Sequence, residues 1–377
     1  MFDPNTFLKK KKQPTVFFPC DIMESGKDLY GYYHSKSRCY NITGIYTEDT
    51  DECRNNTTMF LGHIHPKRPK VFNTSHRITA YYEGKNLVFE TANNEICKQE
   101  PYQLKTDLFS RNSGILESDC MLGKGAIIIG CGSVGSLVAL ELARSGVGRF
   151  YLIDGDIMCY HNICRHQCGI SDVGKYKVDA VKQRILQINP KAIVETSTVT
   201  IQEAPLLALE TFINPDTIMI GCADNREGDL FACEQLAKPN GIPFISIGCW
   251  ERAFAGEIFY CLPEGMPTYA DFVSALGANS GRVHANTHLY MGEVGSFEPG
   301  ISVDINFVTI IAIKIVLDLL NRNDNNYTQR VLPSLSQYTL ICNTNNPKIG
   351  GDMAEIFSYP LQITTNIEVD YSKVKAI

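Results

Sequence analysis

The chain has 377 residues, of which 44% are hydrophobic and 20% charged, an ordinary globular composition with room for two domains. Its formal net charge of −6 argues against nucleic acid as a general partner, because binding phosphates requires a basic surface. The 14 cysteines form no CxxC pair and no apolar signal region follows the N-terminus, so we expect reduced thiols and a cytoplasmic location. The longest apolar stretch, residues 301–320, contains Asp304, Lys314 and Asp318, which argues against a membrane span and predicts a buried helix.

The first hundred residues have an irregular pattern. Short apolar runs are separated by polar, turn-rich segments, and they lie at residues 15–18, 30–34, 79–82 and 86–90. This spacing is typical of a mainly β or α+β fold. We therefore predict a smaller N-terminal domain over residues 1–104.

From residue 125 the pattern changes to alternating strands and helices. Short apolar runs predict strands at 125–130, 149–154, 192–196, 217–221 and 243–248. Apolar residues at helical spacing predict helices at 136–146, 175–189 and 227–237. This alternation predicts a Rossmann-like α/β domain over residues 105–377, with a mostly parallel sheet covered on both faces. Residues 262–300 are glycine-rich and lack periodicity, which predicts a long crossover loop.

A glycine-rich turn joins the first of these strands to the first helix. Gly130, Gly132 and Gly135 form a GxGxxG pattern, which permits a tight turn and presents free N–H groups at a helix N-terminus to a phosphate. Asp154 follows at the end of the next strand, where a carboxylate binds ribose hydroxyls. These residues serve NAD and ATP equally well.

The residues after Asp154 favour ATP. Asp156, Asn162, Arg165 and Lys177 follow in quick succession. Arginine and lysine neutralise the charge of a triphosphate, whereas a dinucleotide pyrophosphate is held mainly by backbone groups. Farther along, Asp224 follows the strand at 217–221, where its carboxylate is well placed to hold Mg²⁺.

These motifs resemble those of the ThiF/MoeB-type and ubiquitin-activating enzymes. The resemblance rests on GxGxxG, D-x-D, N-x-x-R, G-x-x-K and the strand-ending A-D-N, within residues 108–320. It implies ATP- and Mg²⁺-dependent adenylation of the C-terminal carboxylate of a ubiquitin-like protein or peptide.

The resemblance also implies a role for each matching residue. Asp154 corresponds to the ribose-binding aspartate and Asn162 to a polar residue of the phosphate site. Arg165 and Lys177 correspond to the phosphate-binding cations. Asp224 corresponds to the Mg²⁺-binding aspartate.

The resemblance extends to a homodimer, because Arg111 matches an arginine that often reaches the phosphates from the partner subunit. The pair Arg165-His166 replaces the Arg-Gln of the housekeeping enzymes. In this pair the chain is similar to bacterial ubiquitin-like conjugation enzymes linked to antiviral (phage) defence.

The cysteines depart from the family pattern. Many relatives bind zinc through two CxxC pairs, whereas Cys261 and Cys342 are single here, so we expect no cysteine-bound zinc in this domain. Relatives that form a thioester carry a cysteine in the crossover loop, and residues 262–300 contain none. Adenylation without a thioester on this chain is therefore expected. Cys249 and Cys261 remain as thioester candidates, although each fits a core thiol better.

Two motifs before residue 105 resemble the JAB/JAMM metalloproteases. Glu24 opens an E-x-G-x-x-L-x-G pattern, and His63 and His65 form H-x-H-P. Asn73 and His76 stand where that family has serine and aspartate. We therefore expect either a zinc site of His63, His65 and His76, with Glu24 as general base, or a degenerate domain that clamps a partner.

Two other functions remain open for the chain. An NAD-dependent oxidoreductase would share the glycine-rich turn but leaves the cations unexplained. A scaffold that binds nucleotide or a ubiquitin-like protein without catalysis would explain the missing loop cysteine. Neither reading involves nucleic acid or a membrane.

Overall fold

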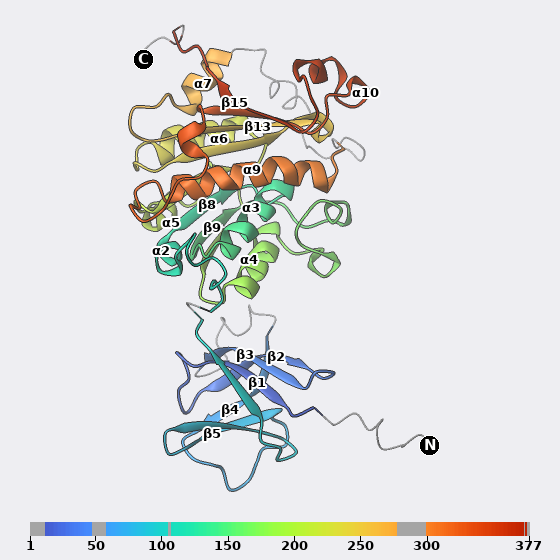
Figure 1. Cartoon of the computed structure of the whole chain (residues 1–377), viewed down its shortest axis with the longest axis vertical. Helices are drawn as coiled ribbons and strands as arrows, with labels where there is room; N and C mark the ends of the chain where they lie inside the picture. Colours follow the sequence, from blue (N-terminus) through green and yellow to red (C-terminus); the bar gives the residue numbers. More distant parts are fainter. Residues whose placement is uncertain (1–11, 47–57, 105–106, 277–298, 373, 375–377) are drawn as a thin grey trace. The chain divides into compact units, whose positions relative to one another are not determined.

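The computed structural model describes residues 12–46, 58–104, 107–276, 299–372 and 374. Its contacts divide the chain into two compact units, Met1–Arg111 and Asn112–Ile377. Figure 1 shows both units, and each is described here by itself.

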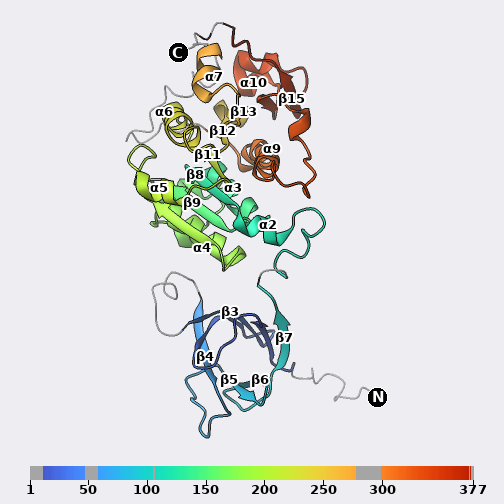
Figure 2. The same ribbon diagram turned by 90° about the vertical axis from the view of Figure 1, so that its left-hand side faces the viewer.

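The first unit is built on one mixed seven-stranded sheet in the order β6-β5-β4-β2-β3-β1-β7. Its strands are β1 (Thr15–Pro19), β2 (Asp28–His34), β3 (Cys39–Tyr46), β4 (Met59–His65), β5 (Ile78–Glu83), β6 (Asn86–Thr91) and β7 (Lys98–Tyr102). The sheet curls around an apolar core, and its two edge strands meet where Gln99 Nε2 donates to the Leu87 carbonyl at 2.8 Å (Figure 2). A preceding β-rich domain is thus confirmed.

The second unit contains an eight-stranded sheet in the order β10-β9-β8-β11-β12-β13-β14-β15. Its strands are β8 (Gly125–Ile129), β9 (Arg149–Ile153), β10 (Ile193–Ser197), β11 (Thr217–Gly221), β12 (Phe244–Cys249), β13 (Ala255–Cys261), β14 (Tyr338–Cys342) and β15 (Gln362–Ile367). The first five strands in this order pair in parallel, and the rest pair antiparallel. The predicted Rossmann-like α/β fold is confirmed.

Helices cover both faces of this sheet. They are α2 (Ser118–Gly123), α3 (Ser133–Arg144), α4 (Lys177–Ile188), α5 (Leu206–Phe212), α6 (Arg226–Phe231), α7 (Tyr269–Leu276), α9 (Ser302–Leu320) and α10 (Pro347–Gly350). Short turns complete the unit: η2 (Tyr160–Asn162), η3 (Ile170–Asp172), η4 (Ala232–Ala237), η5 (Glu251–Ala253), η7 (Leu332–Ser334) and η8 (Gly351–Ile356). Helices α3, α4 and α9 pack on one face and α5, η4 and α7 on the other (Figure 2).

The strand residues explain this two-faced packing. In β8, Ala126 and Ile128 point to the face of α3 and α9, whereas Ile127 and Ile129 point to the opposite face. Successive side chains of a strand point to opposite faces, so an unbroken apolar run requires cover on both.

Three elements differ in detail from the sequence predictions. The predicted helix at 227–237 ends as α6 at Phe231 and continues as the π-helical turn η4. The crossover segment contains α7, and its residues 277–298 lie outside the described residues. The last strands are antiparallel, because β13 follows β12 through the short turn η5.

Helix α9 confirms the helix predicted at 301–320. Its buried Asp318 carboxylate accepts hydrogen bonds from the Tyr327 hydroxyl at 2.7 Å and from the backbone N–H groups of residues 330–332. A buried charge is tolerated when donors surround it in this way. Within the described ranges, no helix combines the length and hydropathy needed to cross a bilayer.

Candidate nucleotide site

The sheet of the second unit places its ligand crevice between β8 and β11. Strand β9 lies on one side of β8 and β11 on the other, so the strand order reverses there. Ligands of open α/β sheets bind outside the carboxyl ends of the strands at such a reversal. A pocket of about 790 Å³ lies at this edge, and it is lined by the segments that follow β8, β9 and β11.

The three glycines of the turn after β8 serve different purposes. Gly130 has a φ of +87°, and a Cβ there would lie 2.7 Å from the Ala223 Cα. A Cβ on Gly135 would lie 1.8 Å from the Gly130 carbonyl oxygen. A Cβ on Gly132 would meet nothing within 4 Å, and Gly132 lines the pocket. Packing therefore requires Gly130 and Gly135, whereas Gly132 leaves room for a ligand.

Gly132→Ala is expected to weaken nucleotide binding with little change in melting temperature. The added methyl group meets no protein atom but occupies the space through which a phosphate approaches the backbone. Gly135→Ala is the matched control, and it should lower the melting temperature because its methyl group collides with backbone. Calorimetric titration with ATP and thermal denaturation test both variants. Unchanged ATP affinity in Gly132→Ala would place the phosphates elsewhere.

Asp154 follows β9 and is held by two backbone groups. Its Oδ2 accepts from Cys131 N–H at 2.7 Å, and its Oδ1 accepts from Asp156 N–H at 2.8 Å. Burial raises the pKa of the Asp154 carboxyl above its usual value, although Lys177 and the two N–H groups partly offset this effect. The carboxylate is therefore oriented by the glycine-rich turn itself.

Lys177 is the first residue of α4 and points back into the pocket. Its Nζ lies 2.6 Å from Asp156 Oδ2, and its backbone N–H donates to the Asp156 carbonyl at 2.9 Å. The lysine side chain is 12% exposed and the aspartate side chain 72% exposed. Burial lowers the pKa of Lys177, but Asp154 and Asp156 outweigh burial and raise it overall. The lysine is therefore a charged ammonium group.

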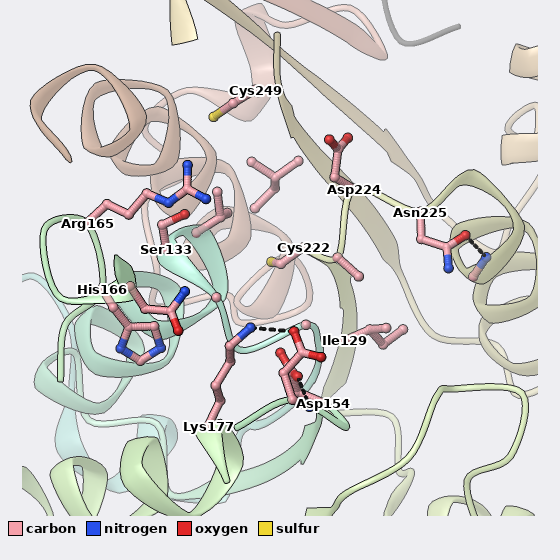
Figure 3. Close-up of a pocket in the computed structure, with 18 of the residues that line it drawn as sticks. Ile129, Ser133, Asp154, Arg165, His166, Lys177, Cys222, Asp224, Asn225 and Cys249 are labelled. Carbon is pink, nitrogen blue, oxygen red and sulfur yellow. Dashed lines mark hydrogen bonds and ion pairs between the residues drawn. The ribbon is translucent and has the colours of Figure 1, made fainter. Parts of the chain in front are cut away.

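Asn162 and Arg165 lie in the segment between β9 and α4. The Asn162 Oδ1 accepts from Cys159 N–H at 2.8 Å, and its carbonyl accepts from Arg165 N–H at 3.0 Å. Both side chains line the pocket. Figure 3 shows Arg165 and Lys177 on the side of this segment and Asp224 at the end of β11. Asn162 thus shapes the turn that carries Arg165.

Asp224 follows β11 in a left-handed backbone conformation, with a φ of 49°. Its carboxylate is exposed and lines the pocket, and the next residue, Asn225, caps α6 by accepting from Gly228 N–H at 3.1 Å. Only a minority of non-glycine residues adopt this conformation, with aspartate and asparagine enriched among them. The turn therefore places a carboxylate beside the glycine-rich turn.

The pocket has a further wall, of which the sequence had singled out only Cys249. Cys249, Trp250 and Glu251 at the end of β12 line the pocket, together with Pro299 and Ile305 near the start of α9. No motif marks these residues, since they come together only when the antiparallel strands and α9 fold onto the parallel ones. His166 was also missed as a lining residue, although the Arg-His pair singled it out.

The cysteines divide between the pocket and the core. Cys249 lines the pocket and is half-buried. Cys261 and Cys342 are buried on β13 and β14, and the Cys261 Sγ lies 3.6 Å from the Cys233 Sγ. Burial places Cys261 away from any bound substrate, so Cys249 is the better-placed thiol of the two thioester candidates.

Gly135 does not line this pocket, and Arg111 belongs to the other unit. Gly135 lies behind the turn, where it is needed for packing. Arg111 is exposed and is the last residue of the first unit. The other eight line the pocket, and they are Gly130, Gly132, Asp154, Asp156, Asn162, Arg165, Lys177 and Asp224.

The three histidines of the predicted zinc site contact other side chains. His63 Nδ1 lies 2.7 Å from Asp28 Oδ1, and His76 Nε2 lies 3.0 Å from Asn73 Nδ2. The rings of His63 and His65 are 4.8 Å apart. Glu24, the predicted general base, pairs with Lys27 at 2.7 Å.

These contacts do not support the predicted zinc site. Among the described residues, no group of three or more histidine, cysteine or acidic side chains is arranged to hold a metal. His63 contacts Asp28 through Nδ1, and His76 contacts Asn73 through Nε2.

Known proteins resemble parts of this chain. Over 195 residues, 47% of this chain and 43% of the relative, the chain is 27% identical to ubiquitin-like modifier-activating enzyme 5 of Arabidopsis thaliana. Over 113 residues, 29% of this chain and 40% of the relative, it is 36% identical to tRNA threonylcarbamoyladenosine dehydratase of Bacillus subtilis. The matched segments span less than half the length of these curated relatives.

Solved structures share the fold. Escherichia coli MccB with MccA-N7isoASN superposes with a TM-score of 0.51 and 18% sequence identity, covering 70% of this chain and 72% of MccB. The sequence profile of the ThiF family matches residues 121–348, which is more than half of the chain. The chain therefore belongs to the ThiF family.

Proposed function

We propose that the chain adenylates a carboxylate with ATP. The observation that carries the proposal is that Arg165, Lys177 and Asp224 line the same pocket as the glycine-rich turn, at the point where the strand order reverses. A dinucleotide site needs the turn and Asp154 but no such cations. An ATP site needs the turn, Asp154 and the cations, because the negative charge on the phosphate oxygens must be stabilised while the adenylyl group is transferred.

The charges of the pocket support a divalent cation. Four carboxylates line it, those of Asp154, Asp156, Asp224 and Glu251, but Arg165 and Lys177 are the only lysine or arginine side chains among the described lining residues. The negative charges of the lining therefore outnumber the positive ones, and they repel a polyphosphate unless a bound cation offsets them. Oxygen ligands are those that Mg²⁺ prefers, and Asp224 would hold it. When bound, Mg²⁺ neutralises charge on the phosphate oxygens.

The proposed reaction needs no general base. The substrate carboxylate is already ionised, and its oxygen attacks the α-phosphorus of ATP while the bond from that phosphorus to the bridging oxygen of the β-phosphate breaks. The products are an acyl adenylate and pyrophosphate. Asp154 would hold the ribose, and Arg165 and Lys177 would stabilise the phosphate charge, so catalysis consists of positioning and electrostatics.

We propose a ubiquitin-like protein or a peptide as the source of the carboxylate. In support, the Arabidopsis relative is named for activation of a ubiquitin-like modifier, and MccB was solved with MccA-N7isoASN. We further propose a homodimer, in which the Arg111 side chain reaches the phosphates in the pocket of the partner subunit. Its exposure fits that role. We also propose that the protein acts in the cytoplasm and in antiviral defence. For residues 1–104 we propose that they hold the protein or peptide partner.

Transfer from the acyl adenylate is proposed to go to an external nucleophile. The crossover loop has no cysteine, and Cys261 is buried in the core. Cys249 lines the pocket, so a thioester on this chain would have to form there.

Isotope exchange between pyrophosphate and ATP tests the proposed function. The purified chain should catalyse Mg²⁺-dependent exchange when a protein or peptide carboxylate partner is supplied, because adenylation is reversible. Omission of Mg²⁺ or amidation of the partner's C-terminus serves as the control. Tight binding of NADH without any response to ATP would contradict the proposal and favour an oxidoreductase. ATP binding without exchange would favour a scaffold.

A further inference from the structure

His166 is a buried histidine beside the pocket, and the proposed reaction assigns it no role. It directly follows Arg165 and is 7% exposed. Its Nδ1 lies 3.0 Å from the Cys168 backbone nitrogen, and its Nε2 lies 2.7 Å from the Cys131 carbonyl oxygen. One ring nitrogen thus faces a local backbone group, and the other faces the glycine-rich turn.

These two partners determine where the ring carries its proton. The Cys168 N–H donates, so Nδ1 accepts and has no proton. The Cys131 carbonyl accepts, so Nε2 carries the proton and donates. The pKa of His166 is lowered overall, mainly by burial and also by the nearby Lys177 ammonium. The Cys131 carbonyl and the Asp172 carboxylate raise this pKa, but they only partly offset the burial. The neutral ring with its proton on Nε2 satisfies both bonds.

The bond to Cys131 connects three parts of the site. Cys131 lies within the glycine-rich turn, and its own N–H donates to Asp154 at 2.7 Å. The neighbouring link between the Arg165 segment and α3 is the bond from Gln167 N–H to Ser136 Oγ, at 3.3 Å. The His166 bond is shorter and more deeply buried than the Gln167 bond, and it joins the residue next to Arg165 directly to the glycine-rich turn.

We propose that His166 is a positioning residue, which ties the segment carrying Arg165 to the glycine-rich turn through its Nε2–H bond to the Cys131 carbonyl. The effect of His166 on the reaction rate rests on the proposed function, whereas the bond to Cys131 does not. Misplacement of a catalytic group by about 1 Å can cost about 100-fold in rate. A site without this restraint would therefore still bind ATP but would hold the Arg165 guanidinium less accurately during transfer.

Two conservative variants separate this role from a general structural one. The amide nitrogen of glutamine reaches as far as Nε2 and can donate to the Cys131 carbonyl, so His166→Gln keeps the tie to the turn. The amide oxygen of asparagine corresponds to Nδ1 and can accept from the Cys168 N–H, so His166→Asn keeps only the local bond. Both variants are uncharged and polar, and they differ in which bond survives.

Pyrophosphate exchange kinetics on the full chain are the first measurement. We expect His166→Asn to lower kcat about 100-fold, with less than about a threefold change in the ATP Kd, and His166→Gln to stay within about threefold of the wild type in both. Equal losses in the two variants would overturn the proposal, as would equal retention. Unfolding of both variants would also overturn it, because it would make His166 a purely structural residue.

Hydrogen exchange measured by mass spectrometry is the second measurement and does not depend on activity. Peptides from residues 126–136 and 159–170 should exchange faster in His166→Asn than in the wild type, and at wild-type rates in His166→Gln. Unchanged protection in His166→Asn would show that the bond does not hold the segment. A wild-type chain without any pyrophosphate exchange would contradict the proposed function alone, whereas this second measurement would still decide whether His166 ties the segment to the turn.

Discussion

Arg165→Ala is expected to slow adenylation by about a hundred- to a thousandfold. Removal of a preorganised charged donor from a site of developing charge costs about 2.7–4 kcal/mol of transition-state stabilisation. The side chain lines the pocket from the segment before α4, so its loss should affect kcat more than the ATP Kd. The melting temperature should change much less than the rate, because Arg165 is only half-buried and lies at the pocket rather than in the core. Pyrophosphate exchange and thermal denaturation test these expectations.

Two further variants control for charge and shape. Arg165→Lys should recover part of the rate, since lysine supplies the charge but not the forked geometry of a guanidinium. Arg144→Ala removes an arginine that pairs with Glu141 on α3 and does not line the pocket, so it should leave the exchange rate unchanged. Full activity in Arg165→Ala would remove this residue from the proposed site.

Asp224→Asn is expected to reduce Mg²⁺-dependent exchange by at least about 100-fold. A bound Mg²⁺ supplies several kcal/mol of charge stabilisation, and an uncharged amide holds the cation less well. Asparagine is the informative substitution, because aspartate and asparagine both tolerate the left-handed conformation found at residue 224. Alanine there would add backbone strain to the loss of charge.

A Mg²⁺ titration distinguishes this effect from general damage. The exchange rate of Asp224→Asn should require a higher Mg²⁺ concentration than that of the wild type. Asp352→Asn, which changes an exposed carboxylate outside the pocket, should follow the wild-type curve. An Asp224→Asn curve with the wild-type midpoint would mean that another group holds the cation.

The fold of the second unit was largely predictable because its strands and helices are continuous in sequence. Apolar runs such as Gly125–Ile129 and Thr217–Gly221 need cover on both faces, and that requirement alone indicates a parallel α/β sheet. The antiparallel strands were harder to predict, because β13 and β14 are separated by a long segment and pair only through tertiary contacts. The curled sheet of the first unit also depends on contacts between distant strands.

That most of the candidate site residues meet in one pocket was predictable for a related reason. Asp154 and Asp224 end strands of a parallel sheet, and the carboxyl ends of such strands meet at one edge. The wall formed by Trp250 and Glu251 gave no signal, because its residues carry no motif. The zinc prediction relied on spacing alone, and among the described residues no group of three metal-binding side chains supports it.

The late position of α9 in the chain affects how the protein is synthesised. Its residues Ile305, Val308 and Ala312 belong to the same apolar core as Ile220 of β11 and Ile247 of β12. A ribosome adds about 5–20 residues per second, so Leu320 follows Cys249 after roughly 4–14 s. During that interval an apolar sheet face lacks its cover and is exposed to other nascent chains. We therefore expect the growing polypeptide to be most prone to aggregation until α9 emerges and packs.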